Sequence, residues 1–83
     1  MATVRLTAWR RGLLKISLTR LIQRETGLTL KPAKECTDRL LGGEVISIVV
    51  PDAEAARRFV READAIGANA EIVSEETVAT AGG

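Results

Sequence analysis

Histidine is absent from this 83-residue sequence, which also has one cysteine and only two aromatic side chains. Without histidine, the sequence lacks the usual base that activates serine or cysteine nucleophiles and the imidazole ligands of many zinc sites. One cysteine can form neither an internal disulfide nor a cysteine-rich metal cage, which is typical of a reducing compartment. We therefore expect no metal, no cofactor and no enzymatic activity, and a chain this short forms one small domain at most.

Long apolar runs are missing as well. The best candidate for a targeting segment, residues 13–18, is interrupted by Lys15 and is followed by no cleavage site of small residues. No window approaches the roughly 20 apolar residues that are needed to cross a bilayer. The sequence therefore favours a cytoplasmic protein that does not enter the membrane.

The net charge of +1 conceals a strong polarity along the chain. Residues 1–41 contain nine Lys or Arg and three Asp or Glu, a net charge of +6, whereas residues 42–83 contain three and eight, a net charge of −5. A basic half of this kind attracts acidic partners. Opposite poles on one molecule also attract each other, so a homo-oligomer would explain the same charges.

Hydrophobic periodicity predicts six elements. Alternation with a period of two predicts strands, and apolar residues at i, i+4 and i+7 predict helices. Gly27, Gly42 and Gly67 follow the helical segments as stop signals, and Thr29 and Asp52 stand where N-caps are favoured. The predicted strands are residues 3–9, 44–50 and 70–74, and the predicted helices are residues 13–25, 30–41 and 53–66.

The order β-α-α-β-α-β predicts an α+β fold of two layers, in which three helices cover one face of a three-stranded antiparallel sheet. The domain spans residues 1–74, and residues 75–83 lack periodicity and are expected to form a frayed tail. We expect Trp9 and Phe59 in the core, and Cys36 as a buried, unreactive thiol on the second helix. The core stripe predicted for the first helix consists of Leu14, Leu18, Leu21 and Ile22.

The opposite face of the first helix has the most unusual surface chemistry. At about 100° per residue, its polar side chains form an arc opposite the stripe, and Ile16 lies inside that arc. An apolar side chain among cations suits an acidic, amphipathic partner, although a solvated face with one isolated isoleucine gives the same pattern. Two lysines extend the patch onto the second helix, against the helix dipole. The candidate partner-binding residues are Lys15, Ile16, Thr19, Arg20, Gln23, Lys31 and Lys34.

Two other functions are left open by the sequence. A basic patch also neutralises the phosphates of nucleic acid, but both aromatic side chains are expected in the core and not on a stacking platform. The sequence ends in Gly82-Gly83, which is similar to the ending of ubiquitin-like sulfur carriers. Those families begin with a β-hairpin, whereas the first strand here leads into a helix.

Residues 26–34, T-G-L-T-L-K-P-A-K, resemble the T-G-L-G-L-K-E-A-K signature of the C-terminal domain of the bacterial large-subunit ribosomal stalk protein. Residues 15–22 are similar to the K-V-A-V-I-K-x-V helix of that family, and residues 66–73 are similar to its A-G-A-x-V-E-V ending. The resemblance covers residues 4–73 and implies the same β-α-α-β-α-β fold.

The resemblance implies a protein-interaction module that contacts translation factors or the ribosome. In that family, the first helix and the start of the second contact translational GTPases such as elongation factors G and Tu. Lys15, Ile16 and Arg20 keep the basic or aliphatic character of the family, as do the two lysines of the second helix. Thr19 replaces a bulky aliphatic residue, and Gln23 replaces an arginine.

A second relative of the same fold is the adaptor that delivers N-degron substrates to the Clp protease. The strand of residues 44–50 followed by Pro51 and Asp52 looks more like this adaptor than like the stalk domain. Its substrate loop is acidic, whereas the corresponding residues here are Arg10, Arg11 and Gly12. An adaptor role for this sequence would therefore involve an acidic peptide.

Overall fold

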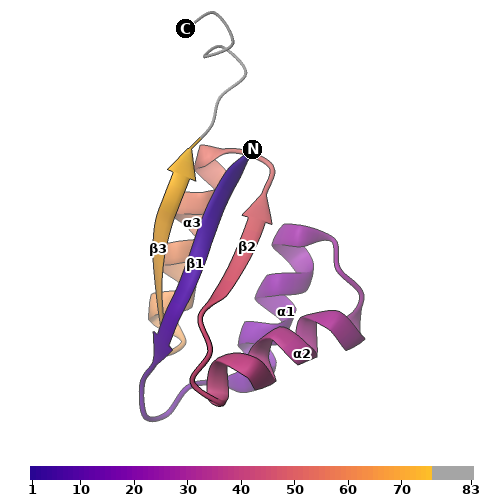
Figure 1. Ribbon diagram of the computed structural model, residues 1–83, viewed down its shortest axis with the longest axis vertical. Coiled ribbons are helices and arrows are strands. Elements are labelled where there is room, and N and C mark those ends of the chain that lie inside the picture. Colours follow the sequence, from indigo (N-terminus) through magenta and orange to yellow (C-terminus); the bar gives the residue numbers. More distant parts are fainter. Residues whose placement is uncertain (76–83) are drawn as a thin grey trace, which may run out of the picture.

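The computed structural model describes residues 1–75 and contains six elements in the predicted order, shown in Figure 1. It confirms the α+β fold with a three-stranded antiparallel sheet and three helices. The elements are β1 (Ala2–Trp9), α1 (Lys15–Thr26), α2 (Leu30–Leu41), β2 (Ile46–Val50), α3 (Ala53–Ala65) and β3 (Ala68–Glu75).

Two strands differ in length from the prediction. β2 begins at Ile46 and not at residue 44, because the backbone N–H of Glu44 still donates to the carbonyl of Arg39 at 3.0 Å in the turn that ends α2. β3 begins two residues earlier than predicted and runs to Glu75, since it pairs with β1 along its whole length. Residues 76–83, which include most of the predicted tail, lie outside the described residues.

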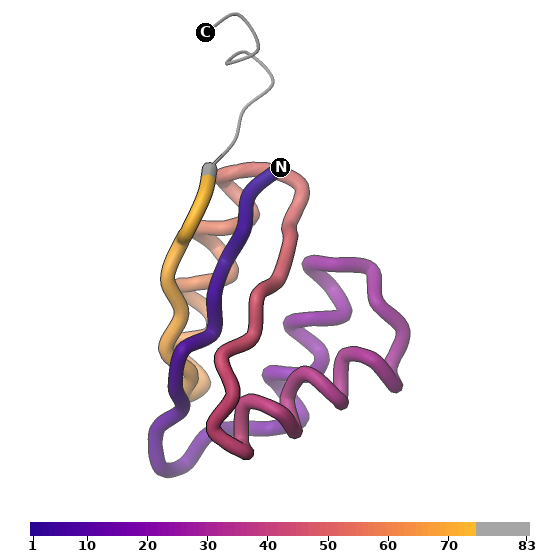
Figure 2. Tube along the Cα trace, in the orientation of Figure 1, coloured from indigo at the N-terminus to yellow at the C-terminus, as the bar shows by residue number. Residues whose placement is uncertain are grey.

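β1 is the central strand of the sheet, with β2 on one side and β3 on the other. Both neighbours are antiparallel to it, as the chain directions in Figure 2 also show. Val4 pairs with Ile48 on one side and with Ile72 on the other, so all three side chains point to the same face of the sheet. The register therefore collects branched aliphatic residues on one face.

That face is the core, because alternate residues of both β1 and β2 are buried there. The helices pack against it: α3 lies on β3 and β1, while α1 and α2 pack on each other and reach β2 and β1 (Figure 1). Phe59 of α3 is fully buried, as predicted. The other fully or nearly fully buried side chains include Val4, Leu6, Leu18, Ile22, Leu40 and Val50.

The opposite face of the sheet is open and mostly polar. On β1 it presents Thr3, Arg5 and Thr7, which are half-buried or exposed. Arg5 forms an ion pair of 3.6 Å with Glu71 of β3 across this face. A polar open face is usual for an antiparallel sheet that is covered on one side only. Val49 of β2, opposite Thr3, is an exposed apolar side chain on it.

Among the five helix ends that were predicted from cap residues, those at Gly27 and Asp52 form the expected contacts, and that at Thr29 does not. Gly27 ends α1 with a positive φ of 77°, and its N–H donates to the carbonyl of Gln23 at 2.8 Å. The Asp52 carboxylate accepts the N–H of Ala55 at 2.7 Å and so caps α3. Thr29 occupies the N-cap position of α2, but its side chain makes no capping hydrogen bond.

Two residues predicted for the core are exposed. Leu14 is the N-cap of α1 and not part of its buried stripe, and its side chain is 55% exposed. Its backbone N–H donates to the carbonyl of Ile66, which fixes the chain before the helix begins. Trp9 is the last residue of β1, where the core ends, and it is 43% exposed. Cys36 is only partly buried and packs at the margin of the core.

Candidate functional site

A groove of about 620 Å³ lies between α1 and α2. Six of the seven residues that the sequence predicts for partner binding line it, although they come from two separate helices. Ile16 is the most exposed large apolar side chain of the described residues, at 72%, and Leu30 of α2 is 60% exposed. The lining residues are Lys15, Ile16, Thr19, Arg20, Gln23, Leu30, Lys34, Thr37 and Asp38.

The floor of the groove is a pair of threonine hydroxyls. Thr19 of α1 and Thr37 of α2 are both buried, and their Oγ1 atoms lie 2.8 Å apart. The Thr19 hydroxyl is also 3.0 Å from the carbonyl oxygen of Lys15, to which it can donate. The prediction that Thr19 belongs to the exposed arc is therefore wrong, because α2 packs over this side of α1 and covers it.

The cations of the groove differ from most others in having few partners. Among residues 1–75, the charged groups of Lys15 and Arg20 make no hydrogen bond or ion pair. Lys34 has one weak contact, 3.9 Å from Asp38 one turn further along α2. By contrast, five arginines form ion pairs with acidic side chains: Arg5, Arg10, Arg24, Arg39 and Arg58.

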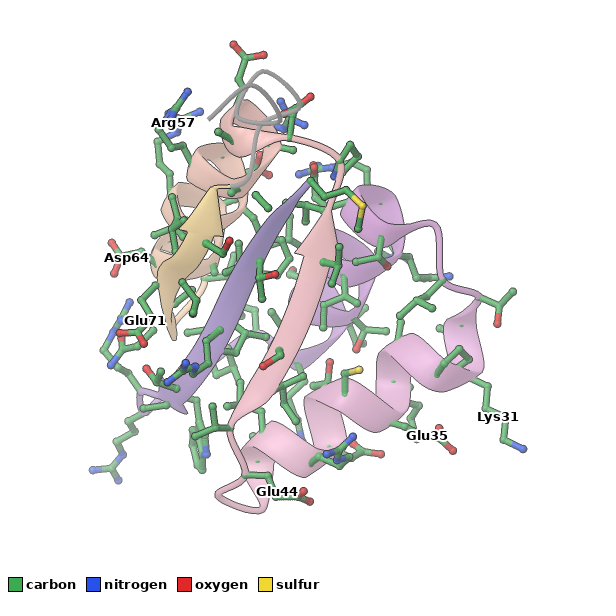
Figure 3. All side chains as sticks on the ribbon, turned by 45° about the horizontal axis from the view of Figure 1, so that its top comes forward. Lys31, Glu35, Glu44, Arg57, Asp64 and Glu71 are labelled. Carbon is green, nitrogen blue, oxygen red and sulfur yellow. The ribbon has the colours of Figure 1, made fainter. Side chains whose placement is uncertain are left out.

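Lys31 is the one predicted binding residue that does not line the groove. It is exposed at the start of α2, and Figure 3 shows its side chain pointing away from the body of the molecule. Lys31 lies three residues before Lys34 in α2, about 60° around the helix from it, and outside the groove. The basic patch is therefore narrower than the sequence predicts, and it is centred on α1.

A second hollow, of about 460 Å³, lies on the other side of α1, between this helix and α3. Sequence reasoning did not predict it, because its residues come from two segments that are far apart on the chain. Arg24 of α1 and Glu62 of α3, which form an ion pair, are 38 positions apart. Arg20 lines both the groove and this hollow. The hollow is lined by Ser17, Arg20, Leu21, Arg24, Glu62 and Ile66.

A buried carboxylate, bonded to Arg24 of the hollow, joins α1 to α3. Glu25 is 7% exposed and accepts a two-pronged interaction from Arg58, at 2.9 Å to Oε1 and 3.2 Å to Oε2. Arg24 adds a bond of 3.1 Å to Oε2 and also binds Glu62 of α3. Arg58 is half-buried because it reaches this carboxylate.

The hydrogen bonds from Arg58 lower the pKa of Glu25 below its usual value, with a further contribution from Arg24, although burial acts in the opposite direction. A signal for this network was present in the sequence. At about 100° per residue, Glu25 falls between Leu18 and Leu21 within the apolar stripe of α1, and a buried carboxylate needs charged or hydrogen-bonding partners.

The structure adds three observations on the other predicted functions. Within residues 1–75, no group of three or more cysteine or acidic side chains is placed to hold a metal ion. No helix in the same part of the chain is long and apolar enough to span a bilayer. Gly82 and Gly83, on which the sulfur-carrier alternative depends, lie outside the described residues.

Comparisons with known proteins do not assign the chain to a family. No protein-family model matches it. A search of curated proteins likewise finds no match. The resemblance to the ribosomal stalk domain and to the Clp adaptor therefore has only the sequence motifs and the shared order of elements to support it.

Proposed function

We propose that this domain is a non-enzymatic protein-interaction module that docks an acidic protein surface on the basic face of α1 and α2. The observation that carries the proposal is the α1–α2 groove, in which exposed Ile16 and Leu30 lie beside the cations Lys15 and Arg20. An apolar centre with a polar rim is the common composition of a protein interface, and arginine is enriched in it.

The lack of intramolecular partners supports this role for the cations. Arg20 and Lys15 are on a helix whose first turn has no acidic residue, and neither forms an ion pair with a described acidic side chain. The nearby acids Asp38 and Glu62 pair instead with Lys34 and Arg24. An acidic partner would supply the missing counter-charges, and charge complementarity would speed association and favour the correct orientation. Following the resemblance to the stalk domain, translational GTPases are the first acidic partners to test.

The test is quantitative capture from a lysate of the native cells, followed by binding measurements with the purified partner and with purified translational GTPases. We expect Arg20→Glu combined with Lys15→Glu to weaken binding about tenfold or more, because like charges then face each other across the interface. Arg61→Glu is the matched control for Arg20→Glu, since Arg61 is an exposed cation of α3 that lines neither hollow.

Equal binding by the wild type, the α1 variants and the control would contradict the proposal. Preferential capture of RNA, with an affinity that falls steeply with salt, would contradict it as well and would favour the nucleic-acid alternative. Circular dichroism of each variant checks that the fold is kept, which we expect because both substituted side chains are exposed.

A further inference from the structure

α1 lies between the α1–α2 groove and the hollow next to α3, and its side chains line both. Towards α2, the groove has Thr19 and Thr37 as its floor and Leu30 on its far wall. Towards α3, the second hollow has Leu21 and Ile66 as its apolar lining, with Ser17 of α1 at its side. Only α1 contributes to both, so any ligand that covers this helix meets two concave surfaces.

Arg20 is the residue that the two hollows share. Its guanidinium makes no ion pair with any of residues 1–75, whereas its neighbour one turn on, Arg24, is engaged by Glu62 and Glu25. A carboxylate bound to this guanidinium lies beside both hollows. A single ligand held there can therefore reach the two.

We propose that the partner straddles α1, placing a carboxylate on Arg20 and one protruding side chain in each hollow. This inference rests on the proposed function, and it extends the docking surface to Ser17 and Ile66, which the sequence does not indicate. An α-helix with its side chains is about 10–12 Å wide, so the two protruding groups of the partner stand about that far apart. The carboxylate lies between them.

The partner chemistry follows from what each hollow offers. The groove accepts an apolar or amphipathic side chain, because exposed Ile16 and Leu30 border a hydroxyl floor. The α3 hollow presents Leu21 and Ile66 to an apolar side chain, and the Ser17 hydroxyl can form a hydrogen bond. Its charged lining residues Arg24 and Glu62 are paired with each other. A partner with a central acid and two flanking protrusions fits this pattern, whereas a uniformly acidic surface leaves both hollows unfilled.

Site-specific photo-crosslinking tests the inference. The full chain is prepared with a benzophenone side chain at position 17, which lines only the α3 hollow, or at position 30, which lines only the groove. A third preparation has the probe at Thr7, on the open face of the sheet. Each is irradiated in a lysate of the native cells, and the adducts are identified by mass spectrometry.

We expect the same partner to be crosslinked from positions 17 and 30, and not from position 7. Arg20→Glu should reduce both adducts about tenfold or more, whereas Arg61→Glu should leave both unchanged. A partner that is crosslinked from position 30 alone would overturn the straddling geometry and leave docking in the groove intact. Different partners at the two positions would overturn it too, and no adduct at either position would overturn both proposals.

Discussion

Replacement of Glu25 by glutamine tests the ionic contact between α1 and α3. The wild-type carboxylate is buried and accepts three charge-assisted hydrogen bonds, two from Arg58 and one from Arg24. Glutamine keeps the size of the side chain but removes its charge, and its NH₂ group then faces a guanidinium donor. We expect a loss of about 2 kcal/mol in the free energy of unfolding, since both arginines remain partly solvated.

For a domain of this size, that loss corresponds to a decrease in Tm of roughly 8–16 °C. Thermal and urea denaturation, followed by circular dichroism at pH 7, measure it. Glu35→Gln is the matched control, because Glu35 is an exposed acid of α2 that lacks an ion pair with the described residues. Its effect should stay within about 0.5 kcal/mol. A change for Glu25→Gln as small as that of the control would refute the reasoning.

The pH dependence of the same pair of proteins provides a second readout. The pKa of Glu25 is lower in the folded protein than its ordinary value of 4.5, so the ionised carboxylate stabilises the fold above that pH. This contribution is lost as the pH falls through the folded-state pKa. The difference in stability between wild type and Glu25→Gln should therefore be largest near neutral pH and shrink progressively below about pH 4.5. A difference that is constant across this range would show that the charge is not its source.

Four further substitutions test local contacts by urea denaturation. Asp52→Ala removes the side-chain cap of α3 and should cost about 1 kcal/mol; no change would show that the cap is dispensable. Gly67→Ala should cost more than about 1 kcal/mol, because φ is 102° and the new Cβ would lie 2.9 Å from the Cα of Leu13; a stabilised variant would contradict the packing of this turn. Thr19→Val and Thr37→Val should be coupled in a double-mutant cycle by about 0.5–1 kcal/mol through their shared hydrogen bond, and strictly additive effects would argue against that bond.

The architecture could be predicted because its signals are local. The alternating residues of β1, the Asp52 cap and the glycine after α1 each act within a few positions, and the structure confirms all three. The predicted ends of helices and strands were less accurate where a contact between distant residues determines them. Leu14 is an example, since the hydrogen bond of its N–H to Ile66 fixes the chain before α1 begins.

The sequence predicted most of the residues of the candidate site, but not the groove that they form between α1 and α2. A helical projection assumes one buried face, whereas α1 is covered by the core on one side, by α2 on a second and by α3 on a third. Thr19 is therefore buried by a helix whose packing angle the sequence does not encode locally. For the same reason, the hollow next to α3 could not be predicted, although Glu25 in the apolar stripe indicated that a charged partner would approach α1.

The most direct test of the account is to locate the bound partner on the domain by NMR. The ¹⁵N-labelled full chain is titrated with the purified partner, and the amide shifts are mapped onto the structure. We predict that the largest changes fall on α1 and the facing part of α2, including Ile16, Arg20 and Lys34, and that they disappear in Arg20→Glu. Changes concentrated on the open face of the sheet, around Arg5 and Thr7, would contradict the central claim that α1 is the docking element.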